Sequence, residues 1–231
     1  NIEIFALGGV SAIAFLDSEN DEEESGGFYS DNEDLRNRVN TGVIGASHQF
    51  FFSTKTYSKI SFAFSGIQNK VLIDTFNVDG SLVSPQYRQN FQRSNIQLNA
   101  LLNHKFNVNH VLRVGSYITR RHYNLLDSAY SFPRGEFLNL RDLQGSNMLY
   151  QPYANWQYRI NDEWEMNTGL HTVISPENEQ YSIEPRWGMT YRLNSKSSIN
   201  LGYGLHSQLP NEILQYSQEI LADGSIYQPN L

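Results

Sequence analysis

Side chains of two kinds alternate along residues 184–206, and this alternation limits the available folds more than any other feature of the sequence. The first kind is large and apolar, and comprises Pro185, Trp187, Met189, Tyr191, Leu193, Ile199, Leu201, Tyr203 and Leu205. The residues between them are mostly charged, polar or small. Successive side chains of a β-strand point to opposite sides, so the pattern predicts a hairpin with two unlike faces. The apolar face is the inside of a soluble sandwich or the outside of a membrane barrel.

The same alternation recurs along the whole chain and predicts an all-β fold. Period-two alternation and β-rich composition indicate nine strands, at 2–16, 40–53, 59–73, 90–106, 111–123, 148–160, 164–174, 181–193 and 198–207. Many of these segments are much longer than the five or six residues typical of soluble strands, and they reach the roughly 9–11 residues that a tilted membrane strand needs. A short helix is expected only near residues 211–221.

The connections between these segments alternate in length. Short polar turns are expected near residues 55, 108, 162 and 195, and long loops at 17–38, 74–89, 124–147 and 208–231, with one shorter connection at 175–180. A meander with short turns at one end and long loops at the other is typical of bacterial outer-membrane barrels. A Greek-key sandwich would scatter its long and short connections between both ends. The pattern therefore predicts one partial up-and-down barrel over residues 1–231, with periplasmic turns and extracellular loops.

Aromatic residues cluster beside the expected short turns. They are Tyr57, Trp156, Tyr158, Trp164, Trp187 and Tyr191. Such a cluster resembles the aromatic girdle at a membrane interface, although the same rings would also suit the core of a soluble sheet. Together with the pattern of connections, the cluster favours a membrane barrel whose apolar face meets lipid.

Composition excludes several classes of function. The net charge of −7, with 17 scattered Lys and Arg residues, argues against a nucleic-acid partner. The absence of cysteine excludes disulfides, thiol catalysis and cysteine metal sites. A mean hydropathy of −0.49 is that of a soluble protein, but a membrane barrel is apolar on only half of each strand and averages to similar values.

Motifs for catalysis or cofactor binding are also absent. No nucleophile elbow, phosphate loop or pair of catalytic carboxylates is present, and the pair His206–Ser207 lacks a third partner. The histidines have no zinc-motif spacing, and the acidic run at 17–24 lacks the spacing of an EF-hand. We therefore expect a protein that is not an enzyme and that binds no metal or other cofactor.

Polar residues on the second face of the strands are the candidates for function. By alternation, the residues that face a lumen are Arg159, Glu165, His171, Glu184, Arg186, Arg192 and His206. They are expected to contact a ligand or a plug domain, or to form a simple charge network. Charges are tolerated there, whereas Arg or Lys facing lipid costs about 2–4 kcal/mol at mid-membrane. The basic stretch 119–122 is expected to snorkel at the rim, with contact to an anionic ligand or lipopolysaccharide as the alternative.

Three stretches between Gln92 and Pro210 are similar to a known family. They read QRSNIQLNALLNHKFNVNHVLRVG, LYQPYANWQYRINDEWEMNTGLH and SIEPRWGMTYRLNSKSSINLGYGLHSQLP. The most specific piece is the turn YRLN followed by the strand LGYGLHSQ, and HKFN and YRIN look like the same turn device used twice more. These stretches resemble the barrel of TonB-dependent receptors of the Bacteroidetes type. Such receptors often carry a carboxypeptidase-regulatory-like domain, and their 22-stranded barrel surrounds an N-terminal plug.

The resemblance implies energy-coupled uptake of a scarce nutrient, such as a metal chelate, an oligosaccharide or a peptide, across the outer membrane of a Gram-negative bacterium. The implied partners are outer-membrane lipid, lipopolysaccharide, a plug domain, TonB and the substrate. About nine strands are visible, without a plug or a TonB-engaging segment, and single-chain bacterial barrels are even-numbered. We therefore expect the middle part of a larger barrel. The alternatives are a smaller barrel acting as a channel or adhesin, and a secreted β-sandwich that binds a ligand.

Overall fold

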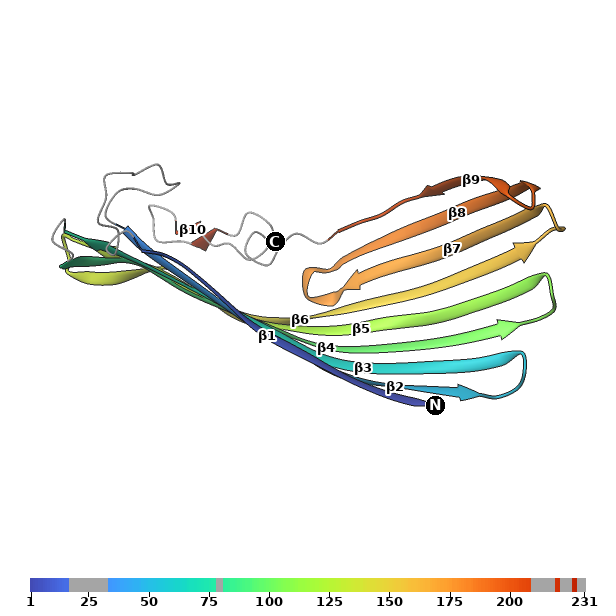
Figure 1. The fold of residues 1–231 in the computed structure, drawn as a ribbon, viewed down its shortest axis with the longest axis horizontal. Helices are drawn as coiled ribbons and strands as arrows, with labels where there is room; N and C mark the ends of the chain where they lie inside the picture. The colour runs from blue at the N-terminus through green and yellow to red at the C-terminus, as the bar shows by residue number, and fades with distance from the viewer. Residues whose placement is uncertain (17–32, 78–80, 209–218, 221–225, 228–231) are drawn as a thin grey trace.

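The computed structural model describes residues 1–16, 33–77, 81–208, 219–220 and 226–227. Nine antiparallel strands form one sheet in chain order (Figure 1): β1 Ile2–Leu16, β2 Glu33–Phe51, β3 Thr56–Phe76, β4 Leu82–Lys105, β5 His110–Ser131, β6 Glu136–Arg159, β7 Trp164–Ser175, β8 Gln180–Asn194 and β9 Ser197–Gly204. A 3-10 turn, η2 (Pro176–Asn178), joins β7 to β8, and β10 (Glu219–Ile220) pairs with β11 (Ile226–Tyr227). The predicted all-β, up-and-down arrangement is confirmed.

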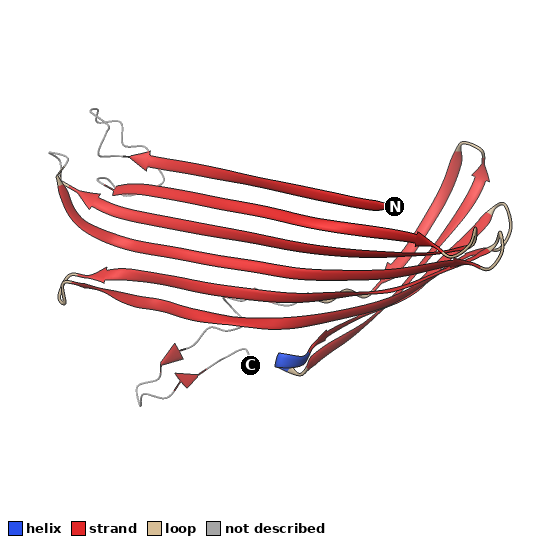
Figure 2. Ribbon diagram, turned by 90° about the horizontal axis from the view of Figure 1, so that it is seen from below, coloured by secondary structure: helices blue, strands red, loops and turns tan. Residues whose placement is uncertain are grey.

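The chain reverses at 52–55, 106–109, 160–163 and 195–196, all at one end of the sheet, which we call the turn end (Figures 1 and 2). The stretches HKFN, YRIN and YRLN share a device there. Asn107 Oδ1 accepts the N–H of Asn109 at 2.8 Å, Asn161 Oδ1 accepts that of Glu163 at 2.9 Å, and Asn194 Oδ1 accepts that of Lys196 at 2.9 Å. A short Asx side chain can bond the backbone two residues ahead, which explains the repeated asparagine.

The opposite end of the sheet corrects the predicted loops. Residues 124–147 consist mainly of β5 and β6, and only 132–135 connect them, while β3 and β4 take up most of 74–89. β2 begins at Glu33, inside the segment expected as a loop at 17–38. Beyond the apolar stretch both faces of these strands are largely polar, so the alternation disappears while the backbone pairing continues. The remainder of that first loop lies outside the described residues, as does most of 208–231, including nearly all of the expected helix at 211–221.

Each strand distributes its side chains over two faces, which we name the Trp187 face and the Glu184 face after residues of β8. Cross-strand pairing assigns the other strands to these faces. An apolar belt crosses the Trp187 face near the turn end. It includes Ile60, Phe62 and Phe64 on β3, Ile96, Leu98 and Leu102 on β4, Leu112, Val114 and Ile118 on β5, Ile183, Trp187 and Met189 on β8, and Ile199, Leu201 and Tyr203 on β9. Most of these side chains are exposed; Leu201 is 65% exposed.

No second layer covers this belt among the described residues. Their buried apolar side chains number four, namely Phe91, Tyr123, Leu125 and Leu149. By alternation all four lie on the Glu184 face, and Phe91, Tyr123 and Leu125 form a small cluster beyond the belt. No helix among the described residues is long and apolar enough to cross a membrane. The sheet therefore presents its largest apolar surface outward.

Successive turns advance along the strands, which reveals the tilt of the sheet. The row of cross-strand partners that starts at Phe51 and Tyr57, beside the first turn, reaches Arg186 on β8. β8 and β9 remain paired as far as Arg192 and Ser198, six residues beyond Arg186. The two turns are six strands apart, so the sheet end advances by one residue per strand. With about 3.3 Å per residue and about 4.8 Å between strands, turns lying at one level imply strands tilted by about 35°.

Three aromatic rings on the Glu184 face cover glycines directly opposite them on the neighbouring strand. Phe5 faces Gly45, Tyr153 faces Gly115 and Tyr123 faces Gly145. A methyl group on any of these glycines would approach the ring to between 2.4 and 2.6 Å. Glycine is disfavoured inside strands, so a ring that shields the bare backbone offsets part of that cost. These pairs also fix the register of β1 with β2 and of β5 with β6.

The pair Tyr123–Gly145 yields a stability prediction. Gly145→Ala should lower the free energy of unfolding by about 1–2 kcal/mol, because the methyl group would lie 2.5 Å from Tyr123 Oη in a packed site. In a Tyr123→Leu background the same change should cost much less, giving a favourable coupling energy in a double-mutant cycle measured by urea unfolding. Gly202→Ala is the control, since its methyl group would lie 3.7 Å from the nearest atom. Equal costs in both backgrounds would refute the steric explanation.

Candidate functional site

Glu184 is the centre of the densest polar cluster on the Glu184 face. The residue is 3% exposed, and its carboxylate accepts hydrogen bonds from Ser207 N at 2.9 Å, Ser207 Oγ at 2.6 Å and Arg186 Nη2 at 2.9 Å. His171 Nδ1 lies 2.9 Å from Glu184 Oε2, on the directly opposite position of β7. The cluster joins β7 and β8 to the segment that follows β9. It is a charge network in which the buried carboxylate is fully occupied by protein partners.

A second cluster lies on the same face nearer the turn end. Arg192 Nη2 donates to Glu165 Oε2 at 2.7 Å, and Gln157 Nε2 donates to Glu165 Oε1 at 2.8 Å. Arg159 is the direct cross-strand partner of Glu165. The structure thus places the predicted residues Arg159, Glu165, His171, Glu184, Arg186 and Arg192 on one face, in two clusters. His206 follows β9, and its Nε2 would lie 3.3 Å from a methyl group on Gly204, which is the cross-strand partner of Arg186.

Between these clusters and β4 the Glu184 face is hollowed. The hollow has a volume of about 470 Å³. Its side chains on this face include Arg113, Tyr117, Tyr153, Asn155, Asn167, His171 and Arg186, and Gly169 and Gly188 also line it. The rings of Tyr117 and Tyr153 are stacked with centroids 5.6 Å apart, and Arg113 Nε donates to Asn103 Oδ1 at 3.0 Å. Such a surface suits polar or anionic contacts. Sequence reasoning missed Arg113, Tyr117 and Tyr153, although the alternation of β5 and β6 places them on this face.

A third polar group lies on the Glu184 face beyond the apolar belt. Asp127 Oδ2 accepts a hydrogen bond from Tyr87 Oη at 3.0 Å and pairs with Arg141 Nη1 at 3.3 Å. Arg141 also lies over the ring of Phe91, 5.5 Å from its centroid. Burial, together with the hydrogen bond to the Asp127 carboxylate, raises the pKa of Tyr87 to about 12. Tyr87 therefore remains a neutral donor at physiological pH.

The Glu184 face also contains buried polar atoms that lack a partner. No hydrogen bond within the described chain reaches Asn37 Oδ1, Asn69 Oδ1, Asn99 Oδ1, Thr75 Oγ1 or Asp127 Oδ1. By the cross-strand pairing all five residues lie on this face. Buried polar groups in native proteins are nearly always hydrogen-bonded to protein or water. This face therefore offers acceptors to water or to a polar surface that packs against it.

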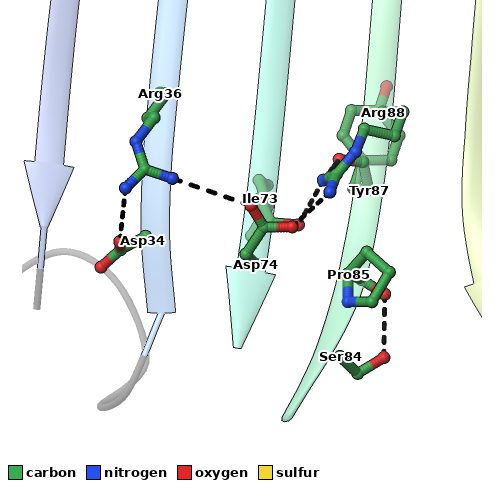
Figure 3. A network of polar contacts seen from close by, with 8 residues as sticks. All are labelled: Asp34, Arg36, Ile73, Asp74, Ser84, Pro85, Tyr87 and Arg88. Atoms are coloured by element: carbon green, nitrogen blue, oxygen red, sulfur yellow. Dashed lines mark hydrogen bonds and ion pairs between the residues drawn. The ribbon is translucent and has the colours of Figure 1, made fainter. Parts of the chain in front are cut away.

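Ion pairs continue on the Trp187 face far from the turn end (Figure 3). Arg36 lies between Asp34 on its own strand and Asp74 on β3, at 2.9 and 3.7 Å, and Arg88 of β4 pairs with the same Asp74. Arg88 Nη1 also donates to the carbonyl of Ile73 at 3.0 Å. Asp34 is fully buried. The network ties β2, β3 and β4 together in the part of the sheet that projects beyond the apolar belt.

The predicted aromatic girdle occupies more than one position. Trp156, Tyr158, Trp164, Trp187 and Tyr191 lie on the Trp187 face by alternation, and Tyr57 lies on the Glu184 face beside Phe51. Rings stack near the turn end, with centroids 4.3 Å apart for Trp164 and Tyr191 and 4.4 Å apart for His110 and Tyr158. Trp187 lies four residues further along β8, inside the belt. Sequence reasoning missed the edge-to-face rings of Phe50 and Phe52 at the first turn.

Metal ligation finds no basis in the part of the chain that the structure describes, where no three His, Asp or Glu residues lie together as a metal site requires. The acidic run 17–24 and the loop residues Phe28 and Tyr29 lie outside the described residues. A comparison with models of known protein families gave no match, and a search of the curated proteins gave none either.

Proposed function

We propose that this chain is an arc of an outer-membrane β-barrel, and that the barrel belongs to a TonB-dependent transporter that takes up a scarce nutrient. The observation that carries the proposal is the apolar belt on the Trp187 face. On β8 the belt runs from Tyr181 to Tyr191, which is ten residue steps. At about 3.3 Å per step and a tilt of about 35°, that is a height of about 27 Å, close to the roughly 25 Å of an outer-membrane barrel.

Water is a poor environment for this belt. It crosses β2 to β9 without interruption, and soluble monomers rarely expose contiguous apolar patches above a few hundred Å². A soluble sandwich would pack a second sheet on it, but the described strands outside the nine-stranded sheet are only the two-residue β10 and β11. A hydrocarbon environment accounts for the belt, for the stacked rings at the turn end and for the tilt of about 35°.

The edges of the sheet support a larger barrel. β1 and β9 each pair on one side only within the described chain. Unpaired backbone N–H and C=O groups are not tolerated in hydrocarbon, so both edges need further strands. β1 is apolar on both faces, with Phe5, Leu7, Ile13 and Phe15 on the Glu184 face. Side chains of this kind suit an interior that is packed with protein at that point.

The Glu184 face has the properties of the interior of such a barrel. Its charges are paired, its hollow carries two arginines and stacked tyrosines, and its unpartnered oxygens accept hydrogen bonds from water or from a plug domain. The assignment to TonB-dependent transporters rests on the resemblance of residues 92–210, including the three asparagine turns. The proposed partners are outer-membrane lipid, lipopolysaccharide, a plug, TonB and a metal chelate, oligosaccharide or peptide. No group of residues on this face suggests covalent chemistry.

The decisive experiment measures the native polypeptide and its energy dependence. We expect the protein to fractionate with the outer membrane of the source bacterium, and its detergent-extracted mass to be several times the 26.5 kDa of this chain. Growth on the limiting nutrient should be lost when either this gene or TonB is deleted. A mass near 26.5 kDa would favour a small channel or adhesin, and recovery in the soluble fraction would refute every membrane assignment. Growth that depends on this gene but not on TonB would refute the transporter class alone.

A further inference from the structure

We propose that a hollow on the Trp187 face, just beyond the apolar belt, binds the anionic sugar headgroup of a membrane glycolipid. This inference rests on the proposed function, because it requires the belt to lie in the membrane. The hollow has a volume of about 720 Å³ and extends over β2 to β6. It is separate from the hollow on the Glu184 face, and none of the residues considered for transport contributes to it.

Five amide side chains form one continuous row along this hollow. Asn40, Gln68, Gln92, Asn124 and Gln144 are direct cross-strand neighbours on five adjacent strands, and all five line the hollow. Part of the row is tied together, since Asn40 Nδ2 donates to Gln68 Oε1 at 3.2 Å and Gln68 Nε2 donates to Asn90 Oδ1 at 2.9 Å. Each amide has two donor hydrogens and an acceptor, so several remain available. Rows of fixed amides are suited to sugar hydroxyl groups, which both donate and accept.

The floor of the hollow is open for a reason other than internal packing. Gly42, Gly66 and Ser94 form the adjoining row, between the amides and the belt. A methyl group on Gly42 or Gly66 would come no closer than 3.8 Å to any atom, so the chain's own structure tolerates a side chain there. The tightly covered glycines at 45, 115 and 145 differ in this respect. Glycine inside a strand often marks the close approach of a ligand, and its cost is otherwise unexplained at these two positions.

Positive charge surrounds the hollow. Arg38 and Lys70 lie in the row beyond the amides, and Arg120 lies in the row next to the belt. All three are exposed, and none forms an ion pair with a residue that the structure describes. Asp142 of β6 is the carboxylate nearest in register on this face, while Asp34 and Asp74 are paired with arginines (Figure 3). His122 lines the hollow itself. The surplus of cations fits a phosphate.

Position selects a lipid over a soluble sugar or a protein. The hollow adjoins the apolar belt along β2, β3 and β4, where Ile44, Phe64 and Ile96 form the last apolar row. A molecule that contacts both surfaces needs acyl chains below and a hydroxyl-rich, anionic headgroup above. A phosphorylated glycolipid has this composition, whereas a glycerophospholipid has the anion without the sugar.

Binding can be measured by native mass spectrometry on the full-length protein in detergent. The probes are monophosphorylated lipid A, phosphatidylglycerol and phosphatidylethanolamine. We expect lipid A to bind at least tenfold more tightly than either phospholipid. Gly66→Val, which fills the hollow, and the double variant Lys70→Gln/Arg120→Gln should each weaken lipid A binding about tenfold. Gly202→Val is the matched control on the other face, where a methyl group also has ordinary space at 3.7 Å, and it should bind as the native protein does.

Several outcomes would overturn the proposal. Equal binding of lipid A and phosphatidylglycerol would indicate unspecific attraction of anions, and unchanged binding in Gly66→Val would place the site elsewhere. A protein that co-purifies and is lost in Gly66→Val would assign the hollow to a protein partner. If Gly66→Val fails to fold, the double variant decides, because it changes only exposed side chains. Loss of outer-membrane localisation would instead refute the proposed function, so the two failures are distinguishable.

Discussion

Leu98→Arg is expected to lower the free energy of unfolding by about 2–4 kcal/mol in a lipid bilayer, the cost of an arginine facing hydrocarbon near mid-membrane. Leu98 is on the Trp187 face of β4, and its cross-strand neighbours Phe62 and Ile118 are apolar. The equilibrium can be followed by urea titration in phospholipid vesicles, with tryptophan fluorescence and gel mobility as two independent probes.

The adjacent residue supplies a matched control. Gln97 belongs to the same strand but points to the Glu184 face, where it is exposed. Gln97→Arg adds the same charge at almost the same depth, and its cost should stay below about 1 kcal/mol because lumen-facing charges remain hydrated. If the Trp187 face were in water, Leu98, already 38% exposed, would also accept an arginine at little cost. Equal small costs for both variants would therefore refute the membrane assignment.

The sequence predicted which residues share a face more reliably than which residues touch. Alternation alone placed Glu165, His171, Glu184 and Arg186 on one side, because the side-chain period of a strand is two. It could not pair His171 with Glu184, since that depends on the register of β7 with β8. That register is set by the connection 176–179, in which Glu179 adopts a left-handed conformation with φ of 52°.

Strand ends were the least predictable part of the fold. Beyond the apolar belt, β5 and β6 carry polar residues such as Asn124, Asp127 and Asn139, which are poor strand formers and typical of loops. Backbone pairing with neighbouring strands outweighs these local preferences. The hollow near the amide row was equally hidden, because its five amides are 20 to 32 residues apart in sequence and meet only through the registers of four strand pairs.

Glu184→Gln should have the second large effect, and a local one. The carboxylate accepts from Ser207, Arg186 and His171, and an amide would present its NH₂ group to some of these donors. Leaving a buried charged network incomplete costs about 2–3 kcal/mol. Arg186 is partly exposed, so water solvates it when its partner is lost, which keeps the cost below that of a fully buried ion pair.

The local effect distinguishes this cluster from an ordinary contribution to stability. Ser207 N donates to Glu184 Oε1 at 2.9 Å, so the exchange of that amide hydrogen should accelerate at least tenfold in Glu184→Gln. Glu165→Gln is the control, because Glu165 has an equivalent arginine partner but no contact with the segment after β9. It should leave the exchange at Ser207 unchanged. If both variants accelerate that exchange equally, Glu184 stabilises the sheet as a whole. If only Glu184→Gln does, the carboxylate anchors residues 205–207 against the polar face, where the chain after β9 helps to shape the interior.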